Sequence, residues 1–206
     1  MGPELFLGLI LVFLVILAVL IVVITPVQPP RPYEPPQKRA GRLGEKYGTG
    51  IIISVLREGD ELLTNVEVSY EGKEAELDNV IVNKYGVFII EVKNYHGWLQ
   101  GLEDDYEWTQ YKETYSDIYS KTVKNPIKQV KRQVYITAHY LREYGVNVWV
   151  DGYVLMVDAG SPVQSNTILT TTNEIDRVIH TVSRRQLSKE TIEEIVALLT
   201  TSLKPS

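Results

Sequence analysis

The chain contains 206 residues, carries a formal net charge of -5 at neutral pH and has no cysteine. The absence of cysteine agrees with a domain that needs no disulfides. An acidic chain has no overall attraction to polyphosphates, so the composition argues against tight, sequence-independent binding of duplex nucleic acid through net charge. Contact with nucleic acid would require a local basic surface.

An uninterrupted apolar run covers residues 5–24. Such a run is long enough to cross the ~30 Å core of a bilayer as a helix. A cleaved signal peptide is the alternative, but Glu4 precedes the run and no convincing cleavage site follows it. We therefore expect residues 1–25 to be an uncleaved, single-pass transmembrane anchor. The C-terminal domain is predicted to be cytoplasmic because all nearby cations follow the run; they are Arg31, Lys38, Arg39 and Arg42.

Proline dominates the next segment, residues 26–40, with six prolines between Thr25 and Pro36. This composition favours an extended polyproline II spacer of ~3.1 Å per residue. A proline-recognition ligand for a partner domain is the alternative, but any proline-rich tether contains such patterns. The segment is therefore interpreted as a spacer between the membrane and the globular domain.

The remaining residues, 41–206, are predicted to form one α/β domain. A helix with β-branched residues near its end is expected first, and a run of strands follows. The expected elements are a helix over Gly41–Leu56, a strand over Leu62–Tyr70, a hairpin of Leu77–Val82 with Val87–Val92, and a continuation of the meander over Gly97–Leu102.

The hairpin is the most informative element because its register can be worked out. A tight turn centred on Lys84 and Tyr85 pairs Asn83 with Gly86, and the same register places Asp78 opposite Glu91. Both faces of the hairpin are apolar at the middle, which indicates a central strand pair covered on both sides.

Two facing carboxylates destabilise a sheet, so a compensating charge is expected. Lys93, on the same face as Glu91, offsets part of the repulsion, and a divalent ion held by Asp78 and Glu91 would offset more. Mg²⁺ suits such a site because it takes oxygen ligands and needs only one or two protein carboxylates. The alternative is a solvated, salt-bridged end of a surface hairpin.

The second half of the domain is predicted to contain three helices and two strands. Asn125 is a good N-cap and Pro126 suits the first helical position, while Gly145 is a stop signal. The expected elements are a helix from Asn125 to about Tyr144, strands over Gly152–Val157 and Thr167–Thr171, a short helix from Asn173 or Glu174, and a last helix capped by Ser188 with an apolar stripe of Ile192, Ile195, Val196, Leu199 and Leu203.

Four sequence blocks in order resemble the nuclease-related domain (NERD) family, which is placed in the PD-(D/E)xK nuclease superfamily. The blocks are GRLGE at 41–45, LDNVIV at 77–82, GVFIIEVKNYHG at 86–97 and NPIKQ at 125–129. The resemblance covers roughly residues 41–145. It implies a restriction-endonuclease-like fold with a central mixed sheet flanked by helices, preceded here by the transmembrane helix.

The resemblance also implies a role for each matching residue. Asp78 corresponds to the metal-binding aspartate, and Glu91 and Lys93 correspond to the ExK pair. Glu45 corresponds to an acidic helix residue beside the metal, and Gln129 to a polar residue that faces the site. With the carbonyl of Val92 as a further ligand, Mg²⁺, or Mn²⁺ in its place, would support phosphodiester hydrolysis in DNA or RNA.

Nucleic-acid contacts are predicted on the helix after Asn125, which borders the catalytic face in the superfamily. Its basic residues fall mostly on one side, although a solvated helix face is an equal alternative; they are Lys124, Lys128, Lys131 and Arg132. Aromatic residues at 98, 108, 111, 115 and 119 would stack on bases, but core packing is the favoured interpretation. The acidic loop at 103–107 is expected to point away from substrate.

Two functions remain open at this point. One is a membrane-anchored, Mg²⁺-dependent nuclease acting on cytoplasmic nucleic acid. The other is a catalytically inactive, membrane-tethered module that keeps the nuclease fold and binds nucleic acid or protein. The histidines show no metal-ligand spacing, and neither a Ser-His-Asp arrangement nor a phosphate-binding loop occurs in the sequence.

Overall fold

The computed structural model describes residues 33–158, 160–181 and 186–201, together with Gly2, Gly8, Phe13, Leu14 and Leu17. The chain divides into two compact units, Met1–Pro35 and Pro36–Ser206. The predicted anchor at 5–24 and the proline-rich segment before Tyr33 lie almost entirely outside the described residues. Within the described part of the chain, no helix has both the length and the apolar character needed to span a bilayer.

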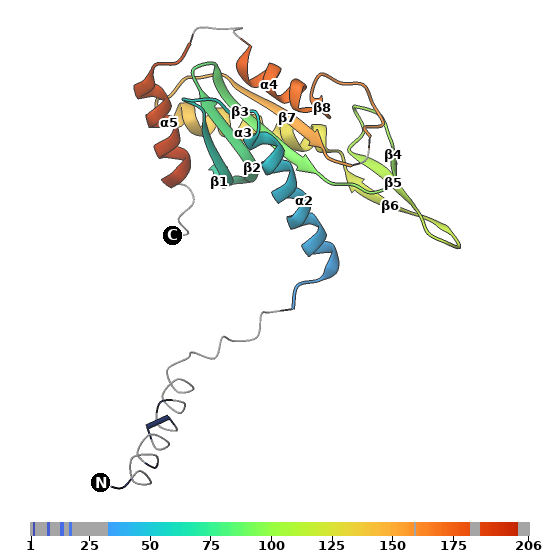
Figure 1. The fold of residues 1–206 in the computed structure, drawn as a ribbon. Helices are drawn as coiled ribbons and strands as arrows, with labels where there is room; N and C mark the ends of the chain where they lie inside the picture. The colour runs from blue at the N-terminus through green and yellow to red at the C-terminus, as the bar shows by residue number, and fades with distance from the viewer. Residues whose placement is uncertain are drawn as a thin grey trace. The chain divides into compact units, whose positions relative to one another are not determined.

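The second unit is an α/β fold with a mixed central sheet and flanking helices, as expected (Figure 1). The central sheet has the strand order β1-β2-β3-β7-β8, in which β1, β2 and β3 are antiparallel and β3, β7 and β8 are parallel. The strands are β1 Glu61–Tyr70, β2 Lys73–Asn83, β3 Gly86–Lys93, β7 Val150–Met156 and β8 Ile168–Leu169.

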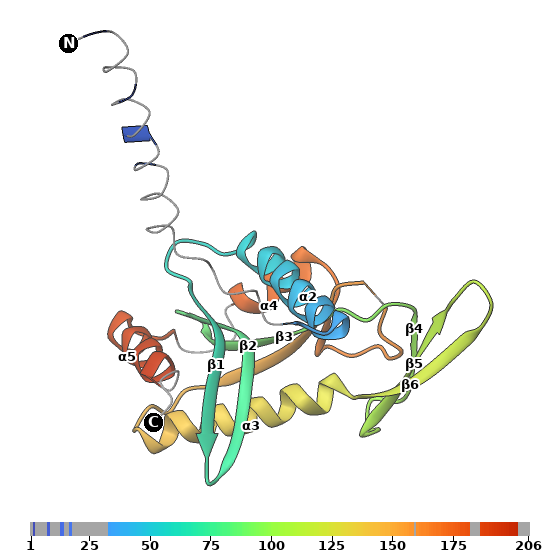
Figure 2. The same ribbon diagram turned by 90° about the horizontal axis from the view of Figure 1, so that it is seen from below.

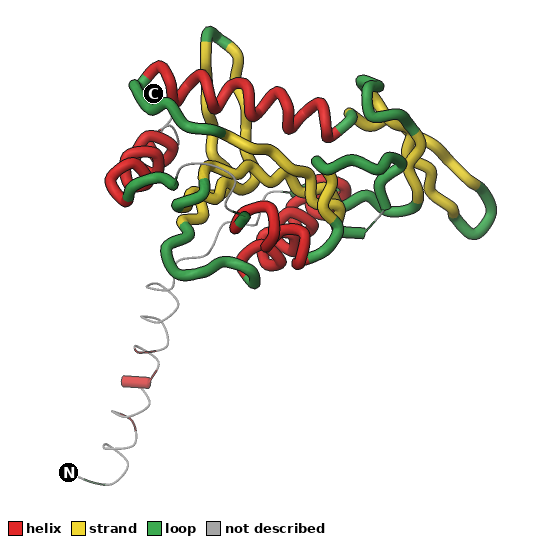
Figure 3. Tube along the Cα trace, turned by 90° about the horizontal axis from the view of Figure 1, so that it is seen from above, coloured by secondary structure: helices red, strands yellow, loops and turns green. Residues whose placement is uncertain are grey.

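Helices cover both faces of this sheet (Figures 2 and 3). Their apolar side chains form two separate cores. On one face, α3 Pro126–Glu143 and α5 Lys189–Thr201 pack on residues such as Val80 and Ile89. On the other face, α2 Pro36–Ile53 and α4 Thr172–His180 pack on Ile81 and Ile90. This double cover confirms that the β2–β3 hairpin is central, as its two apolar faces predict.

The hairpin has the predicted register. Asn83 lies opposite Gly86, Val82 opposite Val87 and Asn79 opposite Ile90. The Asn83 side chain accepts a hydrogen bond of 2.8 Å from the backbone N–H of Tyr85, which is the local turn bond that asparagine offers. Gly86 has a φ of 150°, a conformation that favours glycine.

Helix α2 approaches the sheet closely because two glycines face it. A Cβ at Gly48 would lie 2.4 Å from the side chain of Val92, and one at Gly44 would lie 2.4 Å from that of Asn94. Thr49 also donates a 2.8 Å hydrogen bond to the buried side chain of Asn79. The GRLGE block is thus explained in part by packing, and it fixes α2 beside the end of β3.

Three expectations differ from the structure. Helix α2 begins at Pro36 rather than Gly41, because proline is favoured in the first turn of a helix, so residues 36–40 are helical and not spacer. The segment at 97–102 does not extend the central meander. It contributes β4 Trp98–Gln100 to a separate antiparallel sheet with two strands that the sequence analysis missed, β5 Glu107–Glu113 and β6 Ile118–Lys124.

The three helices predicted in the second half of the domain are confirmed. Asn125 caps α3 by accepting a 2.9 Å hydrogen bond from the N–H of Ile127, and Gly145 follows with a φ of 84°. Helix α4 begins at Thr172, one residue before the earlier of the two predicted starts, and Thr171 is its N-cap. In α5, Ile195 and Leu199 are fully buried, which confirms the packing role of that stripe, while Leu203 lies outside the described residues.

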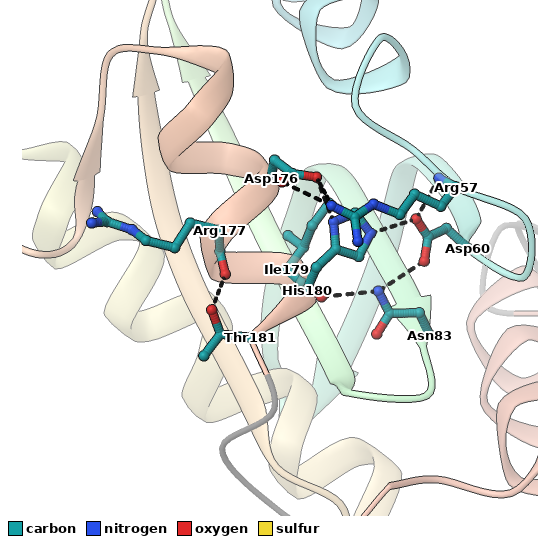
Figure 4. Close-up of polar contacts among 8 residues, drawn as sticks. All are labelled: Arg57, Asp60, Asn83, Asp176, Arg177, Ile179, His180 and Thr181. Carbon is teal, nitrogen blue, oxygen red and sulfur yellow. Dashed lines mark hydrogen bonds and ion pairs between the residues drawn. The ribbon is translucent and has the colours of Figure 1, made fainter.

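A buried polar cluster ties α4 to the rest of the domain (Figure 4). His180 contacts Asp60 through Nε2 and Asp176 through Nδ1, each at 2.8 Å. Asn83 donates to Asp60 at 2.9 Å and to the carbonyl of Ile179 at 3.1 Å. The cluster therefore joins three segments that are far apart in the sequence.

Candidate active site

The candidate site lies at the carboxyl end of β3, where its pairing with β2 stops. The regular ladder ends at Asn79 and Ile90. Two residues beyond Ile90, the N–H of Val92 donates a 2.8 Å hydrogen bond to Oδ2 of Asp78 instead of to a backbone carbonyl. The strand end therefore presents the Asp78 carboxylate next to Glu91, as the register predicts.

Glu91 is the centre of the site, and its side chain is only 2 % exposed. Lys93 donates to Oε1 at 2.5 Å, and Gln129 donates to the same oxygen at 2.6 Å. Gln133 donates to Oε2 at 2.6 Å. Three donors thus compensate the burial of one carboxylate, in agreement with the rule that buried charges are paired and hydrogen-bonded.

Helix α3 supplies two of these donors because Gln129 and Gln133 are four residues apart and share one helix face. Gln133 is 3 % exposed and also donates to the carbonyl of Glu76 at 2.8 Å, which anchors it to β2. Gln129 was predicted from the sequence to face the site, whereas Gln133 was not. The available signal was a second glutamine on a face otherwise occupied by residues such as Ile127 and Val130.

The two carboxylates influence each other strongly. Burial, and then the charge of Glu91, raise the pKa of Asp78 from 3.8 to about 7. The Val92 hydrogen bond and the charge of Lys93 lower that pKa, and Glu45 on α2 raises it slightly. For Lys93, burial lowers the pKa, but the charge and hydrogen bond of Glu91 outweigh burial and raise it above 10.5.

The structure therefore brings four of the predicted residues into one cluster: Asp78, Glu91, Lys93 and Gln129. Glu45 is exposed on α2 and acts on Asp78 through its charge. The carbonyl of Val92 faces the same strand edge as its N–H, because both groups of an extended residue point the same way. That N–H contacts Asp78, so the carbonyl is directed to the side of the site.

Comparison with known proteins indicates the family of the chain. A family model described as the nuclease-related domain matches residues 40–157, which is more than half of the chain. The chain belongs to the NERD family. An uncharacterised protein of Bacillus anthracis is 26% identical over 175 residues, covering 76% of this chain and 82% of that protein. No solved structure matches significantly.

The donors of the NERD domain fit a small divalent cation. Oxygen atoms of Asp78 and Glu91, with the carbonyl of Val92, are the hard ligands that Mg²⁺ prefers. Across the described part of the chain, no group of three or more histidine, aspartate or glutamate side chains has the geometry of a metal site. With two carboxylates as protein ligands, an ion here would keep positions for water and substrate, which suits Mg²⁺.

The predicted basic surface of α3 is largely neutralised within the domain. Lys128 pairs with Asp104 at 3.0 Å, and Lys131 pairs with Glu103 at 3.5 Å. Arg132 donates to a backbone carbonyl of β2, whereas Lys124 is exposed at the end of β6. The acidic loop packs beside the start of α3, where Asn125 donates to the carbonyls of Glu103 and Asp105.

The aromatic residues of the second sheet divide into two groups. Trp108 is 1 % exposed and belongs to the core, as the favoured interpretation required. Trp98 is 45 % exposed and stacks on Tyr111 with ring centroids 5.3 Å apart. Tyr115 and Tyr119 are also exposed, so core packing does not account for them.

Proposed function

We propose that this NERD domain is a divalent-metal-dependent nuclease that hydrolyses phosphodiester bonds of DNA or RNA. Its fold would be that of the restriction endonucleases, and Mg²⁺, or Mn²⁺ in its place, would be the cofactor. The observation that supports the proposal is the pair of adjacent carboxylates, Asp78 and Glu91, at one strand end with Lys93 beside them. Such a pair is unfavourable without a cation, as the raised pKa of Asp78 indicates.

Each residue then has a distinct task. Asp78, Glu91 and the carbonyl of Val92 would hold the ion. A bound Mg²⁺ supplies a Lewis acid for the phosphate and lowers the pKa of a coordinated water. The ammonium group of Lys93 would position the attacking water and stabilise the negative charge that develops on the phosphate. Glu45 would orient the site, and Gln129 would keep Glu91 in place.

We further propose that the apolar run at 5–24 anchors the protein in a membrane, with the NERD domain in the cytoplasm. The length of the run and the cations that follow it support this arrangement. Fractionation of cells that express a tagged full chain would test it. Recovery of the protein in the soluble fraction, or cleavage of the tagged NERD domain by a protease added outside intact cells, would contradict it.

The decisive experiment measures cleavage of labelled single-stranded DNA, duplex DNA and RNA by a fragment covering 33–206, with Mg²⁺, Mn²⁺ or EDTA. We expect metal-dependent cleavage that is lost in Glu91→Gln and in Lys93→Met. Glu67→Gln and Lys112→Met, which change residues of β1 and β5 outside the cluster, serve as matched controls. Cleavage that survives both substitutions in the cluster would refute the assignment of the site.

A binding module without catalytic activity is the second candidate. The intramolecular pairing of Lys128 with Asp104 and of Lys131 with Glu103 favours it, because this surface offers few free cations to a phosphate backbone. Absence of cleavage on all three substrates, together with retained binding of one of them, would support this alternative.

A further inference from the structure

The hydrogen bonds to Glu91 leave few of its oxygen lone pairs available to coordinate a metal ion. A carboxylate has about four lone-pair positions, two on each oxygen. Lys93 and Gln129 occupy both positions of Oε1, and Gln133 occupies one of Oε2. A cation that reaches Glu91 without displacing a donor therefore meets a single free lone pair, which belongs to Oε2.

These donors are held rigidly. Gln129 and Gln133 project from the same face of α3, and Gln133 is tied to the carbonyl of Glu76 at 2.8 Å. The Oε1 atom of Gln133 is buried and has no hydrogen-bond partner within the described residues. A buried polar atom without a partner costs about 1–3 kcal/mol. The amide group of Gln133 therefore carries this cost in exchange for its two hydrogen bonds, to Glu91 and to the carbonyl of Glu76.

We propose that Gln129, together with Lys93, makes the site selective for Mg²⁺ over Ca²⁺ by restricting Glu91 to coordination through one oxygen, which Gln133 orients. This inference rests on the proposed metal site. Ca²⁺ takes six to eight oxygens and readily uses both oxygens of one carboxylate, whereas Mg²⁺ requires a compact octahedral set. Lys93 and Gln129 occupy Oε1 of Glu91, so a cation cannot be coordinated by both carboxylate oxygens of Glu91. Coordination by both oxygens is the arrangement that favours Ca²⁺.

The two glutamines have different tasks in this arrangement. Gln129 fills the last position of Oε1, so its removal opens coordination by both oxygens. Gln133 orients Oε2, so its removal loosens the ligand without freeing Oε1. Loss of a group that orients a metal ligand lowers metal affinity by about 10–100-fold in other proteins.

The test is calorimetric titration of Mg²⁺ and Ca²⁺ into the full chain, purified in detergent, and into three variants. Gln129→Met is expected to raise the affinity for Ca²⁺ relative to Mg²⁺ by about tenfold. Gln133→Met is expected to lower both affinities by about tenfold and to leave their ratio unchanged. A general loss of fold would lower the affinities for both ions in both variants. The ratio of the two affinities therefore distinguishes a change in selectivity from unfolding.

Gln110→Met is a matched control. Gln110 is also buried, donates to a backbone carbonyl, that of His96, and has an Oε1 atom with no partner among the described residues. This variant should bind both ions like the wild type. An unchanged ratio of affinities in Gln129→Met would overturn the inference while leaving the metal site intact. If the wild-type chain binds neither ion, the proposed metal site itself fails.

Discussion

Replacement of Asp78 by asparagine is expected to stabilise the metal-free domain at about pH 8, although it removes a proposed catalytic group. Asparagine has nearly the same size and keeps an oxygen that accepts the 2.8 Å hydrogen bond from Val92. It lacks the charge, which is unfavourable beside the buried Glu91. The substitution therefore removes an electrostatic cost without opening a cavity.

The pKa of Asp78 sets the size of the effect. In the folded domain this pKa is about 7 instead of 3.8, so the folded state holds a proton that the unfolded chain has released. Stability falls with rising pH wherever the folded state binds more protons, here between about pH 4 and pH 7. At ~1.4 kcal/mol for each pH unit, the loss amounts to roughly 4 kcal/mol. Below that pH range the electrostatic cost of ionised Asp78 is absent, and above that range the folded state bears the whole cost.

Thermal denaturation of the fragment covering 33–206, followed by circular dichroism in EDTA, measures this difference. For a domain of this size, 1 kcal/mol corresponds to about 2–4 °C, so Asp78→Asn should melt roughly 8–16 °C above the wild type at high pH. The two proteins should melt together near pH ~4. Glu67→Gln, on an exposed position of β1, controls for the removal of a negative charge.

Addition of Mg²⁺ should close most of this difference, because the ion removes the cost that asparagine avoids. A ligand present at about 100 times its Kd stabilises the folded state by ~2.7 kcal/mol. The wild type should gain this stabilisation and Asp78→Asn should not. If Asp78→Asn is less stable than the wild type at every pH, the carboxylate is a structural group and the electrostatic reasoning is wrong.

Four further substitutions test the fold and the surface of α3. His180→Ala leaves the nearly buried Asp60 without its hydrogen-bond contact to Nε2 and should lower the free energy of unfolding in urea by about 1–3 kcal/mol. Gly48→Ala should destabilise the domain by about 1–3 kcal/mol through contact with Val92, whereas Gly50→Ala, which faces open space, should stabilise it by up to about 1 kcal/mol. Asp104→Asn frees Lys128 from its acidic partner and should tighten binding of single-stranded DNA, with a steeper salt dependence measured by fluorescence anisotropy.

The core of the site could be predicted because it depends on local rules. The turn at Asn83–Gly86 fixes the hairpin register, and the period of two along each strand then places Asp78 and Glu91 on one face. The cap at Asn125 similarly fixes the start of α3 and hence the face that carries Gln129. Each step needs only neighbouring residues, so none depends on how the domain packs.

The parts that were missed depend on packing. Strand β6 is exposed at nearly every position, so it shows no apolar alternation from which a strand could be recognised. Gln133 is one glutamine on an amphipathic helix, and only the placement of α3 over β3 reveals that it contacts Glu91. The pairing of Lys128 with Asp104 joins a helix to a loop 24 residues away, and charge patterning along the helix cannot detect it.

The hydrogen bonds around Glu91 link the stability of the domain to the chemistry of the site. Burial of a charge requires compensation, and Lys93, Gln129 and Gln133 provide it. The same three donors determine how many lone pairs remain for a cation. A substitution that relaxes this set therefore changes the stability of the fold and the ion preference together. Measurements on metal-free and metal-bound protein must be paired, because either one alone would confuse a structural effect with a catalytic one.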